Sequence, residues 1–230
     1  TLKIPGEHNI SNAMAAYTLA RSFGIAEATI FRALASYQSS WRRMEYKGKF
    51  KIQKSPSGES PQATAKFKIL VYDDYAHHPT EIKATLAAFR QQYPHATLIC
   101  VFQPHHVMRL KLLFKDFVSA FDDVDALILL PIYRVAGRDT PAKMSHNILV
   151  RKLANTISQR LVRKNCNQTV VYLPSPKNLR KTIQTLVRKK FADSDEFVVS
   201  DRILVMMGAG DIYKMTHKLI EWNATPMYYS

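Results

Sequence analysis

From residue 66 onward, short apolar segments typical of strands alternate with longer helical segments. We expect strands at 67–73, 97–102, 125–130, 169–173 and 202–206, and helices at 79–92, 109–121, 145–163, 176–190 and 211–222. Consecutive strand–helix–strand units place parallel strands side by side and cover the sheet with the connecting helices. The alternation therefore predicts an α/β fold, with a mostly parallel sheet and helices on both of its faces.

The first 65 residues have a different pattern. Apolar side chains recur at helical spacing in 9–23 and 26–37, 44–54 has the character of a strand, and 55–65 is a loop rich in Pro and Ser. Two helices without a sheet of their own are expected to be the end of a preceding domain. We therefore predict a hinge at the end of 1–43 and a complete domain over 44–230, in a chain cut from something longer.

Length and composition exclude several classes of protein. The chain has 230 residues, of which 47% are hydrophobic, and no apolar run approaches the roughly 20 residues of a membrane span. The two cysteines, Cys100 and Cys166, have no second ligand at zinc-finger spacing. We expect buried thiols in a reducing compartment rather than a disulfide or a zinc site.

The positive charge is concentrated in one part of the chain. Lys and Arg number 33 against 18 Asp and Glu, a net charge of +15, and the segment 134–190 has 14 basic residues against one acid, Asp139. Such a surface attracts phosphates, anionic membranes and nucleic acids without specificity. Because no nucleic-acid-binding motif accompanies these charges, solvated helix faces are favoured over a specific nucleic-acid partner.

Three polar clusters follow predicted strands, at the ends where α/β sheets bind ligands. They are YDDYAHHP (72–79), FQPHH (102–106) with Arg109 beyond it, and MGAGD (207–211). If these strands are neighbours, the clusters meet in one crevice. Histidines beside carboxylates suit a metal site or acid–base chemistry, and for His77, His78 and His105 a purely structural role is the alternative.

The glycines argue against one class of enzyme. Gly208 and Gly210 are most simply explained by a tight turn from strand to helix, with Asp211 capping the helix. The first turn from strand to helix in the sheet has no G-x-G-x-x-G. Its absence counts against a nicotinamide or flavin enzyme.

Two further groups precede the sheet. Asn9 and Asn12 open the first predicted helix, where an amide can either bind the edge of a purine or cap the helix. Arg42 and Arg43 lie at the predicted hinge, where a planar guanidinium can clamp a phosphate.

Taken in chain order, these motifs resemble those of one family. The segments GEHNISNA (6–13), RR (42–43), DDYAHHP (73–79), FQPH (102–105) and GAGD (208–211) follow one another as in the Mur ligases of peptidoglycan synthesis. The resemblance covers nearly the whole chain. Within the family, DDYAHHP with FQPH looks most like the members that join L-alanine to UDP-N-acetylmuramate.

The resemblance implies a cytoplasmic three-domain ligase, of which this chain is the end of the central ATP-binding domain and the whole C-terminal Rossmann-like domain. In such ligases ATP and Mg²⁺ activate the muramyl carboxylate as an acyl phosphate, which the amine of L-alanine attacks. Family analogy assigns adenine contacts to Asn9 and Asn12, the γ-phosphate to Arg43, the ribose or phosphate region to Asp74, and the amino acid and muramyl end to Tyr75, His77, His106 and Arg109.

This sequence departs from the family pattern at two places. His106 stands where the family usually has Arg, so a permanent cation is replaced by a group that is mostly neutral at pH 7. After the third strand, Tyr133 is followed by Arg134 rather than by Pro-Ala, and Arg138 is a candidate to replace the missing cation.

One element of a complete ligase is missing from the sequence. No G-x-x-x-x-G-K-[ST] phosphate loop occurs in the 230 residues. The magnesium ligands and catalytic lysine of the family belong to the same missing part. We therefore expect no metal site in this chain and no complete reaction by the chain alone.

Two other functions remain open at this stage. One is the related ligase that attaches a recycled murein peptide to UDP-N-acetylmuramate, which shares the histidine motifs but is expected to lack FQPH. The other is a non-catalytic basic α/β binding module, which His106 and the basic segment 134–190 favour slightly.

Overall fold

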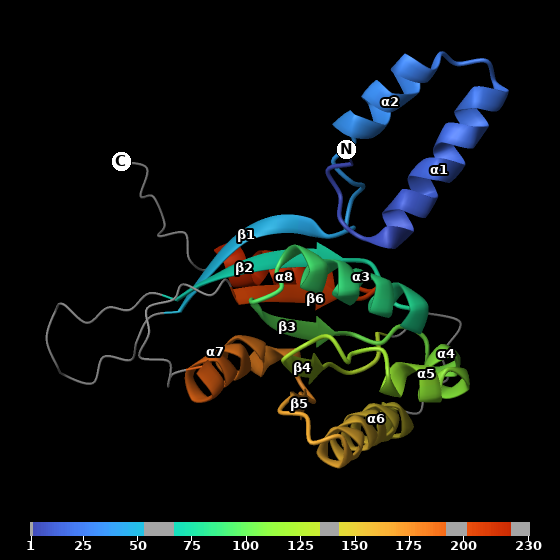
Figure 1. Ribbon diagram of the computed structural model, residues 1–230. Coiled ribbons are helices and arrows are strands. Elements are labelled where there is room, and N and C mark those ends of the chain that lie inside the picture. The colour runs from blue at the N-terminus through green and yellow to red at the C-terminus, as the bar shows by residue number, and fades with distance from the viewer. Residues whose placement is uncertain (1, 53–66, 134–142, 192–201, 222–230) are drawn as a thin grey trace, which may run out of the picture.

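The computed structural model describes residues 2–52, 67–133, 143–191 and 202–221, and these ranges contain one six-stranded sheet (Figure 1). The strands are β1 (Glu45–Ile52), β2 (Phe67–Asp74), β3 (Thr97–Phe102), β4 (Ala126–Leu129), β5 (Thr169–Tyr172) and β6 (Arg202–Met207). Their order across the sheet is β1-β2-β6-β3-β4-β5, with β1 antiparallel to β2 and every other pairing parallel. The predicted mostly parallel α/β sheet is confirmed.

Helices cover both faces of this sheet. They are α3 (Pro79–Gln92), α4 (Val107–Leu112), α5 (Phe114–Val118), α6 (Lys143–Arg163), the short 3₁₀ turn η1 (Pro176–Asn178), α7 (Leu179–Phe191) and α8 (Ile212–Glu221). Helices α3 to α6 pack on one face, and α7 and α8 pack on the other. None of the helices in the described ranges has the length and apolar character needed to cross a bilayer.

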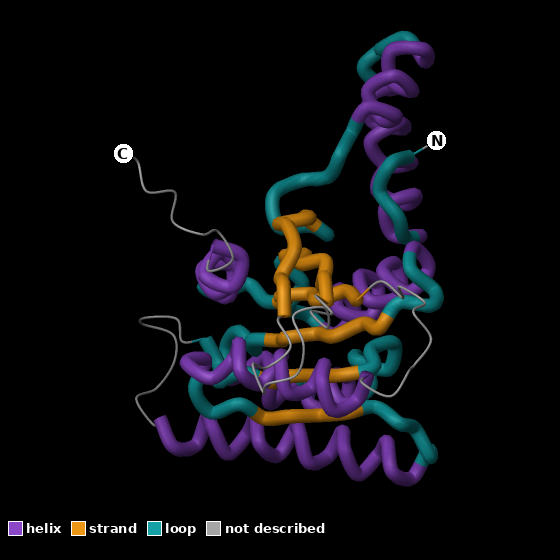
Figure 2. The backbone as a smooth tube through the Cα atoms, turned by 90° about the vertical axis from the view of Figure 1, so that its left-hand side faces the viewer, coloured by secondary structure: helices purple, strands orange, loops and turns teal. Residues whose placement is uncertain are grey.

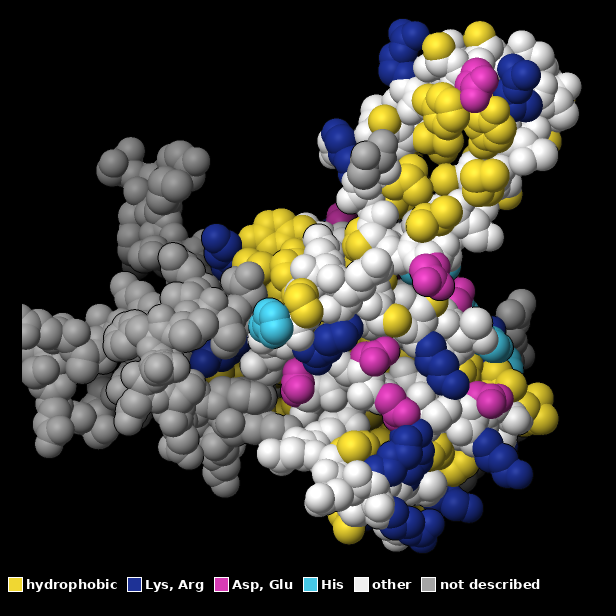
Figure 3. Space-filling view, viewed as in Figure 1, with side chains coloured by type: hydrophobic (Ala, Val, Ile, Leu, Met, Phe, Trp, Pro, Cys, Tyr) yellow, Lys and Arg dark blue, Asp and Glu magenta, His cyan; other side chains and the backbone are white. Residues whose placement is uncertain are grey.

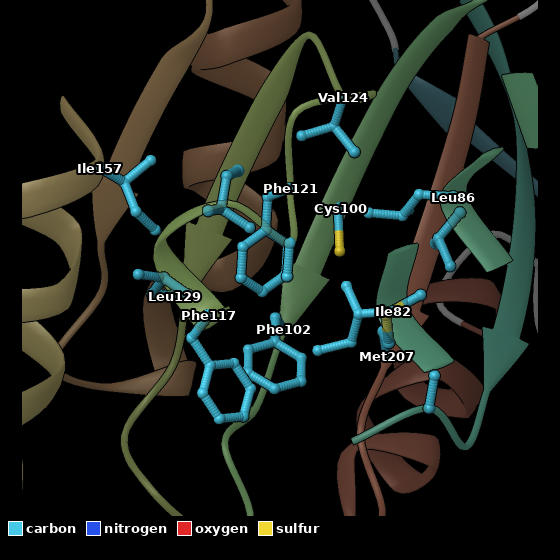
Figure 4. Packing of buried hydrophobic residues seen from close by; sticks show 14 of the residues in the cluster. Ile82, Leu86, Cys100, Phe102, Phe117, Phe121, Val124, Leu129, Ile157 and Met207 are labelled. Carbon is cyan, nitrogen blue, oxygen red and sulfur yellow. The ribbon is translucent and has the colours of Figure 1, made fainter. Parts of the chain in front are cut away.

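Beyond their first residues, Thr97 and Arg202, the central strands β3 and β6 are apolar because both of their faces are buried. On β3, Cys100 and Phe102 point toward α3 to α6, whereas Ile99 and Val101 point toward α7 and α8. Figure 4 shows the first of these faces, with Phe102 lying beside Phe117 of α5. Burying a side chain of this size stabilises the folded state by about 1.5–3 kcal/mol relative to leaving it exposed. The packed core therefore fixes the positions of the strand ends.

The structure corrects one of the predicted helices. The segment expected to form a single helix over 109–121 forms α4 and α5, because the chain leaves the helical conformation at Leu113 (φ −103°, ψ 22°). The apolar spacing continues through the break, with Leu110 and Phe117 both in the core. Sequence periodicity alone therefore does not show where this helix is interrupted.

The two cysteines differ in their surroundings. Cys100 is buried in β3 as expected, and burial raises the pKa of its thiol. Cys166 is exposed, contrary to expectation, because it lies in the turn between α6 and β5 rather than in a strand.

Two helices precede the sheet and stand away from it in both backbone views (Figures 1 and 2). Helix α1 (Glu7–Ser22) has no buried residue, and Ile30 is the buried residue of α2 (Glu27–Ser36). The two helices contact each other through Tyr17 and Phe31, whose stacked rings lie 5.5 Å apart. Figure 3 shows yellow, hydrophobic side chains on the surface of this helical hairpin. Its exposed large apolar residues include Ile10, Met14, Leu19 and Phe23.

Candidate active site

The three polar clusters predicted at strand ends lie together at one edge of the sheet. Strand β6 lies between β2 and β3, and Met207 at its end is paired with both Asp74 and Phe102. Backbone hydrogen bonds continue these pairings past the strands: Gly208 N–H donates to Asp74 O at 3.0 Å, and Gln103 N–H donates to Met207 O at 3.0 Å. The carboxyl ends of β2, β6 and β3 are therefore neighbours at one edge of the sheet. We call this edge, where α/β folds bind ligands, the crevice.

Two glycines allow the chain to pass closely through this crevice. A Cβ atom at Gly208 would lie 2.6 Å from the carbonyl oxygen of Gln103, and the residue has a φ of 149°. A Cβ atom at Gly210 would lie 2.4 Å from the ring of Tyr133. These close approaches explain both glycines without a bound phosphate, in agreement with the interpretation as a tight turn.

Aromatic rings line the crevice. The ring of His105 stacks on that of Tyr133, with centroids 5.8 Å apart and planes inclined by 14°. His77 lies edge-on to His105 at 5.8 Å and to Tyr75 at 5.3 Å. Residues from the ends of β2 and β3 and from the segment after β4 thus face one another.

His77 is set up as a neutral base. It is partly buried, and its Nδ1 lies 3.1 Å from the backbone oxygen of Tyr75 and 3.3 Å from the carboxylate of Glu81. Desolvation by burial lowers the pKa of His77 below its usual value, with a smaller lowering from the charge of Arg109. When Nδ1 carries the proton and donates to Tyr75 O, Nε2 keeps its lone pair for a ligand.

Arg109 supplies an unsatisfied cation. It projects from α4, and its Nη1 atom is buried without a hydrogen-bond partner among the described residues. A buried guanidinium N–H that lacks a partner is costly, and such groups are characteristic of sites completed by an anionic ligand. Arg109 is near enough to His77 for its charge to lower the pKa of the imidazole. The two groups together suit a ligand that carries both a carboxylate and an amine.

His106 directly precedes α4 and adopts a left-handed conformation, with φ 71°. Its ring lies 6.4 Å from that of His105, so the position is next to the crevice. The side chain makes no capping hydrogen bond to α4. Arg138, the candidate replacement for the missing cation, lies outside the described residues.

His78 has a structural role. Its Nδ1 accepts a hydrogen bond from Thr80 N–H at 3.3 Å, and Glu81 accepts one in return from His78 N–H at 3.2 Å. This reciprocal arrangement caps α3. The structural alternative is therefore sufficient to explain His78.

The two adjacent arginines occupy different environments. The side chain of Arg43 is 45% exposed, 3.9 Å from Glu81, and lies over the ring of Tyr75 at 5.7 Å. Arg42 is 1% exposed and bonds to the backbone oxygens of Gly208 and Gly210. Arg43 is thus available to a ligand. The prediction that Arg42 can clamp a phosphate is wrong, because its guanidinium is buried and donates its hydrogen bonds to backbone oxygens of the protein.

Asp74 is also occupied by the protein. The residue is 1% exposed, and its carboxylate accepts hydrogen bonds from Met44 N–H and Ala76 N–H, each at 2.8 Å. Burial raises the pKa of Asp74. Its carboxylate ties the segment before β1 to the end of β2, and the contact with nucleotide expected from the family stays a prediction.

The two asparagines lie on α1. Asn9 donates from its amide to Pro5 O at 2.6 Å, and Asn12 is exposed. The residue that precedes the helix is Gly6, and no side chain bonds to cap α1 there. Capping therefore does not explain these residues, and their contact with adenine stays a prediction.

A comparison with known protein families shows to which family the chain belongs. Residues 62–210 match the family described as Mur ligase, glutamate ligase domain. The chain belongs to the Mur ligase family. The resemblance indicated by the sequence motifs is confirmed.

Two curated relatives in the Mur ligase family carry the same name. A UDP-N-acetylmuramate–L-alanine ligase of Clostridium kluyveri is 34% identical over 214 residues, which are 93% of this chain and 38% of the relative. The protein of the same name from Clostridium perfringens is 42% identical over 139 residues, 60% of this chain and 27% of the relative. The chain thus spans less than two fifths of the length of these relatives.

Solved structures of Mur ligases share the fold. The UDP-N-acetylmuramate-alanine ligase MurC of Thermotoga maritima superposes with a TM-score of 0.63 at 21% identity, over 96% of this chain and 39% of that one. A murein peptide ligase of Psychrobacter arcticus gives 0.59, also at 21% identity, over 96% and 38%. These likenesses show the fold of the Mur ligase C-terminal region.

Two tyrosines beside the crevice received no site role from the sequence, although Tyr133 was noted at the start of a stretch that departs from the family pattern. Tyr133 lies after β4, and its isolated bridge to His105 places it in the crevice. Tyr213, on α8, lies over the guanidinium of Arg42 at 5.1 Å. No spacing rule connects these tyrosines to their partners, which are distant along the chain.

Proposed function

We propose that this chain is the C-terminal part of an ATP-dependent ligase of peptidoglycan precursor synthesis that joins L-alanine to UDP-N-acetylmuramate through an acyl phosphate. The observation that carries the proposal is the crevice at the carboxyl ends of β2, β6 and β3. It combines the buried, unpartnered Nη1 of Arg109 with a neutral His77, and Arg43 lies exposed beside the segment that precedes the sheet.

On the acceptor side, Arg109 binds a carboxylate of the substrates by charge-assisted hydrogen bonds. An amino acid at pH 7 carries an ammonium group, which must lose a proton before nitrogen attacks an acyl phosphate. Nε2 of His77 is an acceptor for that proton, because burial keeps the ring neutral. The new C–N bond forms as the C–O bond to the phosphate breaks, and the departing phosphate takes the second proton of the attacking nitrogen. The imidazolium then releases the first proton to solvent.

On the nucleotide side, Arg43 approaches the phosphates from the segment before β1. Its exposed guanidinium balances the negative charge that accumulates during phosphoryl transfer. ATP supplies the phosphoryl group that activates the muramyl carboxylate. The site works in the cytoplasm, and Asn9 and Asn12 of α1 contact the adenine.

The described residues do not fit a Mg²⁺ site by themselves. Among them, no three His, Cys, Asp or Glu side chains are grouped as metal ligands. Mg²⁺ prefers carboxylates together with substrate phosphates. Its protein ligands are therefore expected from the preceding domains of the complete ligase.

The relatives favour L-alanine over a recycled murein peptide as the acceptor. The curated proteins with 34% and 42% identity are named as L-alanine ligases, while the likeness to the murein peptide ligase is one of fold at 21% identity. FQPH is also present, as expected for the L-alanine ligases.

Phosphate release measured in the complete ligase tests this function. Turnover with ATP and UDP-N-acetylmuramate is expected to require L-alanine, and a murein tripeptide should not replace it. The 230-residue chain alone is expected to give no turnover, because it contains no phosphate loop. Turnover with the tripeptide but not with L-alanine would show that the acceptor is wrong, and no turnover with either would contradict the ligase function.

A further inference from the structure

Arg42 is a buried cation that the functions assigned so far do not use. Its guanidinium bonds to Gly210 O at 3.2 Å and to Gly208 O, and its Nε lies 3.4 Å from Asp73 Oδ2. The same group lies over three aromatic rings, those of Trp41 at 5.6 Å, Tyr75 at 5.2 Å and Tyr213 at 5.1 Å. A cation that is 1% exposed requires such compensation, since burying an unpaired charge is very costly.

These contacts join three parts of the chain that the sequence separates. Arg42 precedes β1, Asp73 and Tyr75 are at the end of β2, and Gly208 and Gly210 follow β6. The backbone of Arg42 also contributes, because Arg42 O accepts a hydrogen bond from Tyr75 N–H at 2.7 Å. We call this set of contacts the Arg42 clasp.

The Arg42 clasp is also part of a closed ring of residue contacts around the crevice. Arg42 binds the backbone of Gly210, and Gly210 packs against the ring of Tyr133. From there the contacts run through ring pairs back to the clasp: Tyr133 with His105, His105 with His77, His77 with Tyr75, and Tyr75 with Arg42. The rings of Tyr133, His105, His77 and Tyr75 are thus connected to Arg42 through packed neighbours.

We propose that Arg42 is a positioning residue that sets the geometry of Arg43, Tyr75 and His77 for the ligation step. Arg43 is its neighbour in the chain and shares the ring of Tyr75 with it, the two guanidinium groups lying 5.7 Å and 5.2 Å from that ring. Fixing Arg42 therefore fixes where Arg43 leaves the backbone and where Tyr75 holds His77. This inference rests on the proposed ligase function.

Substitution of Arg42 in the complete ligase tests the role. Arg42→Met removes the charge and all donors with little loss of volume. Arg42→Lys keeps a cation among the rings, but its compact ammonium lacks the fork that reaches two carbonyls. We expect kcat to fall about ten- to a hundred-fold for Arg42→Met and less for Arg42→Lys, with the KM for UDP-N-acetylmuramate nearly unchanged, because small displacements of reacting groups cost about this much.

Arg90 offers a matched control. Its guanidinium also bridges backbone oxygens and a carboxylate, contacting Ala96 O and Asp123 O at 2.8 Å and Asp125 Oδ2 at 3.0 Å. Those partners lie at the amino ends of β3 and β4, the edge of the sheet opposite the crevice. Arg90→Met should lower the melting temperature without lowering kcat at a temperature where both variants are folded. If Arg42→Met keeps the wild-type kcat, or if Arg90→Met loses as much, the positioning role is wrong.

A second measurement separates this inference from the ligase function. If the complete wild-type protein shows no ligation, the proposed function fails, and the clasp is then judged by Trp41 fluorescence in the 230-residue chain. In a Trp222→Phe background Trp41 is the remaining tryptophan. Trp41 is 66% exposed, and its ring lies 5.6 Å from the guanidinium of Arg42. Arg42→Met should change both the emission maximum of Trp41 and its quenching by acrylamide, because the adjacent cation is lost, whereas Arg90→Met should leave both unchanged. Equal quenching in wild type and Arg42→Met would overturn the clasp itself.

Discussion

At the scale of single residues, Arg43 and Arg109 are cations with different surroundings and different expected substrates. Arg43 is exposed beside the predicted hinge, whereas Nη1 of Arg109 is buried and unsatisfied among the described residues. In the complete ligase, Arg43→Ala should mainly raise the KM for ATP or lower kcat. Arg109→Ala should mainly raise the KM for L-alanine or the UDP-sugar. Losing a charge-assisted hydrogen bond worth about 1.5–3 kcal/mol corresponds to about ten- to a hundred-fold.

Steady-state kinetics with each substrate varied in turn separates these effects. Because both variants are expected to remain folded, their melting temperatures serve as the control. If Arg109→Ala altered the ATP parameters alone, the assignment of the crevice to the acceptor side would be wrong.

His106 gives a gain-of-function prediction. The residue lies beside His105 with a left-handed backbone, at the position where the family usually has Arg. His106→Arg should tighten acceptor binding if the position still holds an anion, because it adds a permanent cation with a planar set of donors. The measurement is the KM of the complete ligase for L-alanine and for UDP-N-acetylmuramate. Unchanged or weaker binding would show that another cation has taken over.

Asp73 makes folding stability depend on pH. Desolvation by burial raises the pKa of Asp73 from 3.8 to about 6, and the charge of Arg42 offsets only part of this rise. Because the folded pKa lies above the unfolded one, the folded chain holds more protons between pH 4 and pH 6. The contribution of this group to stability is therefore present below about pH 4 and is lost as pH rises to about 6. The difference between the two pKa values corresponds to about 3 kcal/mol.

Urea unfolding of the wild type and of Asp73→Asn, at several pH values from 4 to 7, checks this dependence. Asn does not titrate. The free energy of unfolding of the wild type minus that of the variant should therefore become more positive as the pH is lowered from 7 to 4. A constant difference across this range would contradict the raised pKa.

At the scale of elements, the turn between β6 and α8 depends on a close approach of two backbones. Gly208→Ala would place a Cβ atom 2.6 Å from Gln103 O at a φ of 149°. Gly48→Ala is the matched control, since its φ is 134° but its Cβ would meet only the side chain of Ile220, at 3.3 Å. Both variants carry a backbone penalty of about 1–3 kcal/mol, and Gly208→Ala should lose about 1–3 kcal/mol more through the clash. Equal free energies of unfolding for the two variants would contradict this account.

Part of the basic segment 134–190 lies on α6, whereas Arg134 and Arg138 lie outside the described residues. Arg151 and Lys152 are exposed on α6, and Arg160 of the same helix pairs with Asp122. The pair with Arg160 lowers the pKa of Asp122. These contacts agree with solvated helix faces, the interpretation that the sequence favoured.

At the scale of the whole molecule, the helical hairpin and the sheet domain differ in how much they bury. Ile30 is the one buried residue that α1 and α2 contribute, whereas the sheet domain has an apolar core on each face. A chain that begins at residue 41 keeps the Arg42 clasp and should unfold in one cooperative transition, with a melting temperature close to that of the full chain. Calorimetry measures both properties. A broad transition without cooperativity would show that α1 and α2 belong to the same folding unit.

The sequence by itself determined the order and type of the elements and the family. Apolar runs bounded by turn residues located β3 and α3 at their observed bounds, and the DDYAHHP and FQPH motifs identified the Mur ligases. These features are local, because a periodic pattern or a motif is complete within a few neighbouring residues.

Only the tertiary structure decided which polar residues are available to a ligand. Arg42 and Arg43 are adjacent and identical in type, yet one is enclosed by Tyr213 and Gly208 and the other is exposed. Likewise, no local pattern announces that β6 lies between β2 and β3 or that Tyr133 stacks on His105. Burial and pairing depend on residues that are distant along the chain, as for Arg42 and Gly208, which are 166 positions apart. Those partners are set by the packing of the sheet.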